Sequence, residues 1–311
     1  MSSIHNPEFS RNFGFMNEAE QQAIFDSRVA IAGVGGDGYQ LGLKLARMGV
    51  QTFDIADPEV FEPENSNRVP GARHSTYGKK KSEVFLDEVM DINPEADVRI
   101  FDDGVTPENT EEFLRRATLV FDESELTYLH VGTGIAREAR KKNIPDVMVM
   151  NIGFAAQVTS FHPESKHTFE KMMGVPDGMP LDEVKELDVD FTRCLPYLPK
   201  YADLSTLEAV QGGAPLPSIS QGVDVACALG SSQAFLHMVS SAGNKRAQPV
   251  WSSNIRYMDA YDGTSATTRF PRVSYYRHLA HAAARNMLGI NPDASYTQDD
   301  RNRRNESFDA V

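Results

Sequence analysis

The sequence predicts an α/β fold in which a doubly wound, mainly parallel sheet carries helices on both faces. Short apolar runs alternate with stretches of helical spacing between residues 28 and 151, and strands that alternate with helices form parallel sheets through right-handed crossovers. A second observation is a run of closely spaced glycines directly after the first apolar run. Strand, glycine turn and helix in this order are typical of the first unit of such a sheet.

The elements of the first half follow from start and stop signals. Asn17 and Glu20 form a capping box, because each side chain can meet the backbone amide of the other, and a short helix follows. Gly49 ends the next helix and Asn93-Pro94 a later one, because glycine adopts the left-handed turn and proline does not extend a helix. We expect strands at 28–34, 51–56, 96–101, 118–121 and 146–151, and helices at 17–25, 39–48, 81–91, after Thr106-Pro107-Glu108 and at 128–142.

The second half of the chain is less regular. Prolines and weak periodicity between residues 162 and 213 predict a long, irregular crossover loop. We expect a helix at 222–240, an edge strand at 255–260, an amphipathic helix at 275–288 and a polar tail at 299–306. Residues 1–262 then form one domain, and residues 263–311 form a C-terminal helical extension.

Composition and charge exclude several classes of protein. The formal net charge of −13 opposes attraction to nucleic acid or to an anionic membrane. No window approaches the roughly 18 uninterrupted apolar residues of a membrane span, and residues 1–7 carry no apolar signal segment, so we expect a cytoplasmic protein. Cys194 and Cys227 are the only cysteines, too few for a disulfide framework or a four-thiolate zinc site. Structural zinc is therefore not expected.

The glycine run predicts a phosphate-binding loop. Glycines permit a tight turn with no side chain between backbone and ligand, and the following helix points its free amides and positive dipole end at the phosphates. Asp57 ends the second strand about 20 residues later, where a carboxylate can accept hydrogen bonds from both ribose hydroxyls. These features fit ATP and NAD equally, and they predict a nucleotide site on a Rossmann-like sheet. The loop glycines are Gly33, Gly35, Gly36 and Gly38.

A run of three lysines points to an anion nearby. Lys79, Lys80 and Lys81 stand at the head of an expected helix, where the positive end of the helix dipole disfavours lysine unless an anion compensates. Bound phosphate would supply that anion. We expect at least two of the three to be solvated.

Four segments in a fixed order resemble a known family. Asp57 to Arg68 matches the pattern D-x-D-x-V-x-x-x-N-x-x-R, Gly78 to Lys81 matches G-x-x-K, Ile92-Asn93-Pro94 matches I-N-P, and Leu119 to Glu125 lies at V-x-D-x-x-D. Together they resemble the ThiF/MoeB adenylyltransferases, relatives of the ubiquitin-activating enzymes, over about residues 9–240. The resemblance implies an ATP-dependent enzyme that activates a carboxylate as an acyl-adenylate. The carboxylate would be the C-terminus of a small ubiquitin-like carrier protein or a peptide.

The resemblance also implies roles for individual residues. A carboxylate attacks the α-phosphate in line, so the step needs positive charge where negative charge builds up, and no general base. Lys81 would contact the α- and β-phosphates, Arg68 the polyphosphate, Asn65 would orient the same group, and Asp57 would hold the ribose. Glu125 would face Mg²⁺.

Dimeric members place an arginine near the N-terminus in the partner's site. Arg11 is the candidate in this chain, and we accordingly expect a homodimer.

The chain departs from the family pattern at three places. Glu125 replaces the usual aspartate, paired C-x-x-C motifs are absent, and Asp37 stands in the glycine loop where the family prefers an apolar residue. A carboxylate there would repel phosphates unless it turns away or meets a cation.

Cys194, in the irregular loop, is a candidate nucleophile. Two alternatives stay open: an NAD-dependent oxidoreductase on the same fold, and a non-catalytic family member that binds nucleotide.

Overall fold

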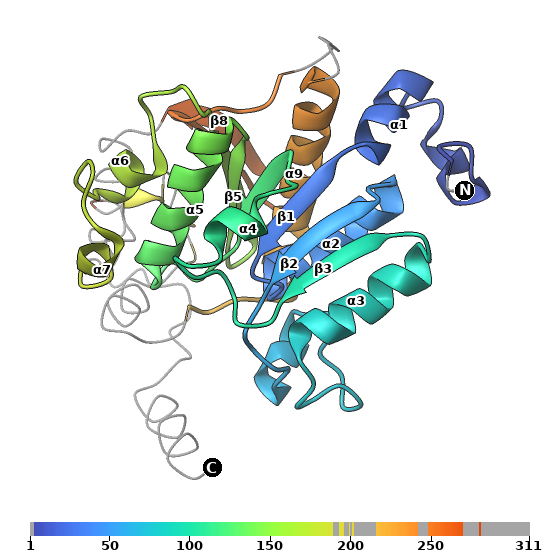
Figure 1. The fold of residues 1–311 in the computed structure, drawn as a ribbon, viewed down its shortest axis with the longest axis horizontal. Helices are drawn as coiled ribbons and strands as arrows, with labels where there is room; N and C mark the ends of the chain where they lie inside the picture. Colours follow the sequence, from blue (N-terminus) through green and yellow to red (C-terminus); the bar gives the residue numbers. More distant parts are fainter. Residues whose placement is uncertain are drawn as a thin grey trace.

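One eight-stranded sheet organises the described part of the chain. The computed structural model describes residues 3–188, 193–195, 199, 201, 216–241, 248–269 and 280. The strand order is β3-β2-β1-β4-β5-β6-β7-β8, and Figure 1 shows the sheet with helices on both sides. Strands β3 to β5 in this order are parallel to one another, and β6, β7 and β8 continue the sheet in antiparallel fashion.

The strands are β1 (Arg28–Ala32), β2 (Thr52–Ala56), β3 (Asp97–Phe101), β4 (Leu119–Asp122), β5 (Asp146–Ile152), β6 (Ala155–Phe161), β7 (Asn254–Asp259) and β8 (Thr264–Arg269). The helices are η1 (Pro7–Asn12), α1 (Glu18–Phe25), α2 (Gly36–Met48), η2 (Pro63–Asn67), α3 (Lys81–Ile92), α4 (Thr110–Phe113), α5 (Leu129–Lys142), α6 (Phe169–Met173), α7 (Leu181–Val184) and α9 (Ser220–Ser241). None of these helices is long and apolar enough to cross a membrane.

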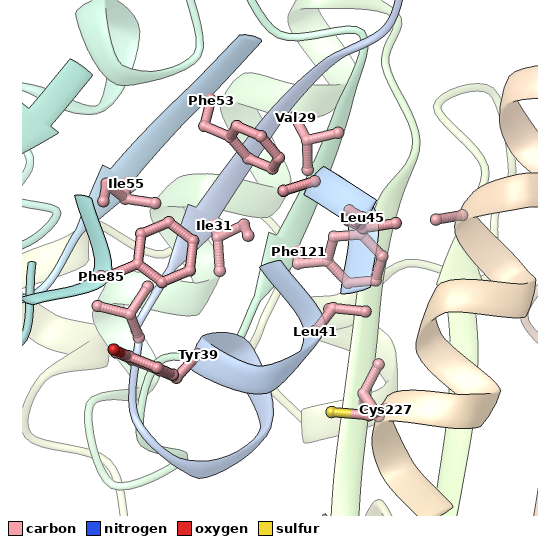
Figure 2. Packing of buried hydrophobic residues seen from close by; sticks show 14 of the residues in the cluster. Val29, Ile31, Tyr39, Leu41, Leu45, Phe53, Ile55, Phe85, Phe121 and Cys227 are labelled. Carbon is pink, nitrogen blue, oxygen red and sulfur yellow. The ribbon is translucent and has the colours of Figure 1, made fainter. Parts of the chain in front are cut away.

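Alternate residues of the central strands serve two separate cores. Side chains of a strand point to opposite faces in turn. In β1, Val29 and Ile31 pack with α2, α3 and α9, whereas Ala30 and Ala32 pack with α4 and α5. Figure 1 shows α4 and α5 in front of the sheet, and Figure 2 shows Ile31, Phe53 and Phe121 against side chains of α2 and α3. The central parallel strands are therefore buried on both faces, as is usual in parallel sheets.

The parallel half of the fold confirms the expected elements. The capping box of Asn17 and Glu20 opens α1, and Gly49 ends α2 in the left-handed conformation. Helix α2 begins at Gly36, three residues before the expected start, because the glycines themselves supply its first turn. Helix α4 begins later than expected and is only four residues long, with Asn109 as its N-cap.

The antiparallel half differs from the expectation. The strand expected at the sheet edge, β7, lies between β6 and β8, so that prediction was wrong. Strand β6 is buried at every position and carries no alternation to reveal it. Strand β8, rich in Ser and Thr, pairs with β7 across the domain boundary expected at residue 262. The crossover loop contains α6 and α7, and the helix and tail expected at 275–288 and 299–306 fall outside the described residues apart from residue 280.

Candidate active site

The carboxyl ends of three strands meet at one edge of the sheet. The register pairs Ala32 of β1 with Ala56 of β2 and with Asp122 of β4. The Gly33 amide donates to the Ala56 carbonyl at 2.8 Å, and the Glu123 amide donates to the Ala32 carbonyl at 2.9 Å. Strands β2 and β4 lie on the two sides of β1, because the chain adds β2 and β3 on one side and then β4 and β5 on the other. The glycine loop therefore leaves the sheet at this reversal of strand order, the point at which open α/β sheets bind ligands.

The glycine loop is closed by two backbone contacts that no other residue allows. Gly33 has a φ of +100°, and a Cβ there would stand 2.4 Å from the Glu123 carbonyl oxygen. A Cβ on Gly38 would stand 2.0 Å from the Gly33 carbonyl oxygen. A Cβ on Gly35, in contrast, meets open space. Gly35 is also the N-cap of α2 and gives the helix no side-chain cap, so the first-turn amides stay available to an anion.

Asp57 closes the loop from the side of β2. It is 4% exposed, and its Oδ2 accepts from the Val34 amide at 2.8 Å while its Oδ1 accepts from the Glu59 amide at 2.8 Å. Burial raises the pKa of Asp57, and the nearby charge of Lys81 opposes that rise. Each oxygen keeps one lone pair, which leaves Asp57 able to accept from a ribose hydroxyl.

Only one member of the lysine run is buried. Lys81 is 5% exposed at the start of α3, and its Nζ forms an ion pair with Glu59. Lys80 pairs with Asp102 at 2.8 Å, and Lys79 is exposed. The anion beside Lys81 in this structure is thus a carboxylate of the chain, in the position where the sequence predicts a phosphate.

Element η2 carries Arg68 to the glycine loop. Asn65 is buried, and its Oδ1 accepts from the Glu62 amide at 3.0 Å, which shapes the turn. The Arg68 guanidinium donates to the Glu64 carbonyl at 3.1 Å and to Asn67 Oδ1 at 2.9 Å. Its Cδ and Nε lie 3.9 Å from where a Cβ of Gly36 would stand. A cation therefore lies directly beside the first turn of α2.

The sequence did not predict a hydrogen-bonded chain that joins the loop to Arg68. Asn151 at the end of β5 donates through its amide nitrogen to both carboxyl oxygens of Asp37, at 3.0 and 2.9 Å. Its Oδ1 accepts from Ser218 Oγ at 2.9 Å, and the Ser218 carbonyl accepts from Asn67 Nδ2 at 2.8 Å. No motif marks Asn151 or Ser218, because their roles depend on a contact across more than 60 residues of sequence. Asp37 turns toward β5, and burial raises its pKa to about 6.

Asp122, the last residue of β4, and Glu123, which follows it, lie on opposite faces of the sheet. Asp122 accepts from Ser124 Oγ at 2.5 Å, and burial raises its pKa to about 6. Glu123 accepts from the Val149 amide at 3.3 Å on the opposite face, and burial together with Asp37 raises its pKa. Glu125 is exposed and accepts from Thr127 at 3.2 Å. Within the described ranges, no three His, Cys, Asp or Glu side chains converge to hold a metal ion.

Arg11 lies far from the glycine loop of its own chain. It is exposed on η1, and η1 is fixed to the other end of α2, where Asn12 donates to the Met48 carbonyl at 3.3 Å. Helix α2 has 13 residues, a length of about 20 Å. Arg11 can therefore serve a glycine loop only in another copy of the chain.

Both cysteines are buried in this structure. Cys194 is 0% exposed and packs with Phe169 and Met173, and its carbonyl accepts from the Gln157 amide group. Cys227 points from α9 toward α2 in Figure 2 and donates to the Asp37 carbonyl at 3.5 Å. Burial raises the pKa of the Cys227 thiol. Neither thiol is presented to a substrate in this conformation.

Comparison with known proteins gives consistent sequence matches. The model of the ThiF family matches residues 9–278. The tRNA threonylcarbamoyladenosine dehydratase of Escherichia coli is 30% identical over 118 residues, which make up 37% of this chain and 44% of the relative. The sulfur carrier protein ThiS adenylyltransferase of Escherichia coli is 27% identical over 143 residues, 46% of this chain and 56% of the relative. The chain thus spans about half the length of these two relatives.

Solved structures share the fold at low sequence identity. The crystal structure of E. coli MccB with ATP has a TM-score of 0.63 at 15% identity, over 88% of this chain and 74% of that one. The structure of PaaA has a TM-score of 0.58 at 18% identity, over 81% and 66%. These matches confirm the predicted fold class. At sequence identities this low, structural similarity is evidence for the fold alone and not for a shared activity.

Proposed function

The chain belongs to the ThiF family, and on that premise we propose that it is an ATP-dependent adenylyltransferase that activates a carboxylate and releases pyrophosphate. The observation that carries the proposal is the approach of Arg68 to Gly36 at the uncapped start of α2. The free amides of the first turn of α2 and the Arg68 guanidinium would then bind the same anionic ligand. That pair suits a polyphosphate whose negative charge grows during transfer.

Different residues of the site would assist different parts of the adenylation step. A carboxylate oxygen attacks the α-phosphorus, the bond to the pyrophosphate oxygen breaks, and pyrophosphate leaves. The α2 amides and Arg68 would hold the phosphates, Asn65 would keep η2 in place, and Asp57 would accept from the ribose. Lys81 would exchange its partner Glu59 for phosphate oxygens when the nucleotide binds. Glu125 offers an exposed hard oxygen for Mg²⁺, which would neutralise phosphate charge.

We propose that the carboxylate is the C-terminus of a small carrier protein or a peptide. The named substrate of one relative is the sulfur carrier protein ThiS, and MccB has been crystallised with MccA. The formal net charge of −13 disfavours a nucleic acid, the other substrate class named among the relatives. An ATP-dependent activity also fits the cytoplasmic location that the sequence leads us to expect.

Exchange of labelled pyrophosphate into ATP tests the proposal. The assay uses Mg²⁺ and a panel of peptides with free C-terminal carboxylates, including tails of ubiquitin-like carriers. Lys81→Ala and Arg68→Ala are each expected to lower exchange about hundredfold, because each removes a cation from the developing charge. Lys79→Ala, a change of an exposed lysine in the same run, should leave exchange unchanged.

The same assay separates the alternatives. Robust exchange by both the Lys81 and Arg68 variants would contradict the assigned roles. Tight ATP binding without exchange against any member of the panel would favour a non-catalytic family member. Binding of NADH with no binding of ATP would favour an oxidoreductase.

A further inference from the structure

Asp37 places a negative charge at the site that should attract one. It is the second residue of α2, and its carboxylate shares the positive end of the helix dipole with any phosphate bound at the loop. Acids are favourable in the first turn of a free helix. They become unfavourable when the helix must also bind a polyphosphate, because the two anions then repel each other.

The Asp37 side chain is held in that position. Asn151 donates to both carboxyl oxygens, and Asn151 is fixed in turn by Ser218. The Asp37 carbonyl also accepts from the Cys227 thiol of α9. Asn151 at the end of β5 therefore fixes the carboxylate on the β5 side of the first turn of α2, while Cys227 holds the Asp37 backbone. A phosphate bound to the amides of that turn would meet this charge at the same end of the helix.

No cation within the described ranges forms an ion pair with Asp37. Arg68 is near enough to favour the ionised carboxylate, but its guanidinium donates to Glu64 and Asn67 instead. A bound polyphosphate would also attract Arg68 and so compete for the same charge. The other titratable groups that interact with Asp37 are Glu123 after β4 and Cys227 on α9, and Lys44 of α2 and Asp224 of α9 act on Cys227 in turn.

We propose that Asp37 couples nucleotide binding to protonation: its charge opposes the polyphosphate, and binding of the nucleotide takes up a proton at the Asp37 carboxyl. The inference rests on the proposed function, because it takes the ligand to be a nucleoside triphosphate. Once protonated, Asp37 still accepts from Asn151 through its carbonyl oxygen. The network therefore survives while the charge disappears.

The size of the effect follows from the proton affinity of the free site. Burial raises the pKa of Asp37 to about 6. Above that pH the proton must be taken from solution, and each further pH unit lowers the affinity for the nucleotide by up to about tenfold. The affinity of the wild-type protein for ATP should therefore fall by up to about tenfold between pH 7 and pH 8.

Isothermal titration calorimetry of the full chain with ATP and saturating Mg²⁺ tests the inference. Titrations from pH 5.5 to pH 8, in pairs of buffers with different ionisation enthalpies, measure both affinity and proton uptake. Asp37→Asn keeps an acceptor for Asn151 and removes the charge. Asp224→Asn is the matched control, since Asp224 also accepts from a side-chain amide, that of Gln40. Titration of the nucleotide itself is common to all proteins and cancels in the comparison.

The expected results are specific to Asp37. Wild type and Asp224→Asn should take up a proton and lose affinity with rising pH, and Asp37→Asn should bind with little pH dependence and more tightly than wild type at pH 8. Wild-type binding without proton uptake, or an equally steep loss of affinity in Asp37→Asn, would overturn the inference. Absence of ATP binding in every protein and at every pH would instead overturn the proposed function. Asp37→Ser serves as a second uncharged variant if Asp37→Asn does not fold.

Discussion

At the first position of β5, Asp146 carries a carboxyl group that is only 2% exposed. Within the part of the chain that the structure describes, neither of its side-chain oxygens has a hydrogen-bond partner. The register places it opposite Val120, on the same face as Asp122. Burial, Asp122 and Glu170 all raise the pKa of Asp146 well above its ordinary value, because each penalises the ionised form.

This environment predicts that Asp146 weakens the fold as pH rises. The folded-state pKa lies above the unfolded value of 3.8, so the stability present below that value is lost as pH rises through the folded pKa. Asp146→Asn removes the ionisation. We expect the variant and the wild type to melt at similar temperatures near pH 4, and the variant to melt at the higher temperature at pH 8, where the wild-type carboxyl must ionise in its buried position. Thermal melts across that range measure the difference, and a wild type that gains stability over Asp146→Asn with rising pH would contradict it.

Among single residues, the sequence identified the groups that lie in local motifs and missed those that depend on distant contacts. Asp57, Arg68 and Lys81 stand at recognisable spacings, and the structure places Asp57 and Arg68 beside the glycine loop. Asn151 and Ser218 belong to no motif. Their role depends on hydrogen bonds between distant segments, from Asn151 to Asp37 and from Ser218 to Asn151. In the sequence, Asp37 was notable only because it is an acidic residue at a position of the glycine loop where the family prefers an apolar one.

At the scale of one element, the glycines in the turn from β1 into α2 have two different roles. Gly38 is needed for close packing of the turn, whereas Gly35 leaves space for a ligand. Gly38→Ala would drive a Cβ against the Gly33 carbonyl, which is backbone and yields little, whereas a Cβ on Gly35 meets open space. We expect Gly38→Ala to lower the melting temperature strongly and Gly35→Ala to lower it much less. Gly35→Ala should nevertheless weaken ATP binding, because its methyl group stands between the free amides of α2 and the phosphates.

Thermal melting and ATP titration of the two variants check this division. Gly78→Ala is a useful third variant, because Gly78 has a positive φ and open space around it but lies outside the loop. It should lose some stability through backbone strain and keep its affinity for ATP. Unchanged ATP affinity in Gly35→Ala would contradict the placement of phosphates at this turn.

The elements of the sheet differ in how far the sequence reveals them. Strands β1 to β5 alternate with helices, and caps such as Gly49 and Asn17 mark the boundaries. Strands β6 and β8 carry no such marks: β6 is buried throughout, and among the strands that the structure describes β8 pairs only with β7. Their place in the sheet is decided by pairing with distant strands, since β7 follows β6 by more than 90 residues. Periodicity within a short window does not report such pairing.

At the scale of the whole molecule, the position of Arg11 bears on assembly. Phe9 and Asn12 of η1 contact the end of α2 that lies opposite the glycine loop. If Arg11 takes part in the reaction, it must do so in the site of a second copy. We therefore propose a homodimer in which each η1 reaches the nucleotide site of its partner.

Mixing two inactive variants tests this arrangement. Arg11→Ala and Lys81→Ala should each lose pyrophosphate exchange when pure. In a hybrid dimer, the Arg11→Ala subunit keeps its own Lys81 and receives the intact Arg11 of the Lys81→Ala subunit, so one complete site forms. If subunits exchange at random, half of the dimers are hybrids with one good site of two, and the mixture should recover roughly a quarter of wild-type exchange. A mixture that stays inactive although light scattering shows dimers would contradict the role of Arg11 across the interface, and a monomeric protein with full exchange would exclude it.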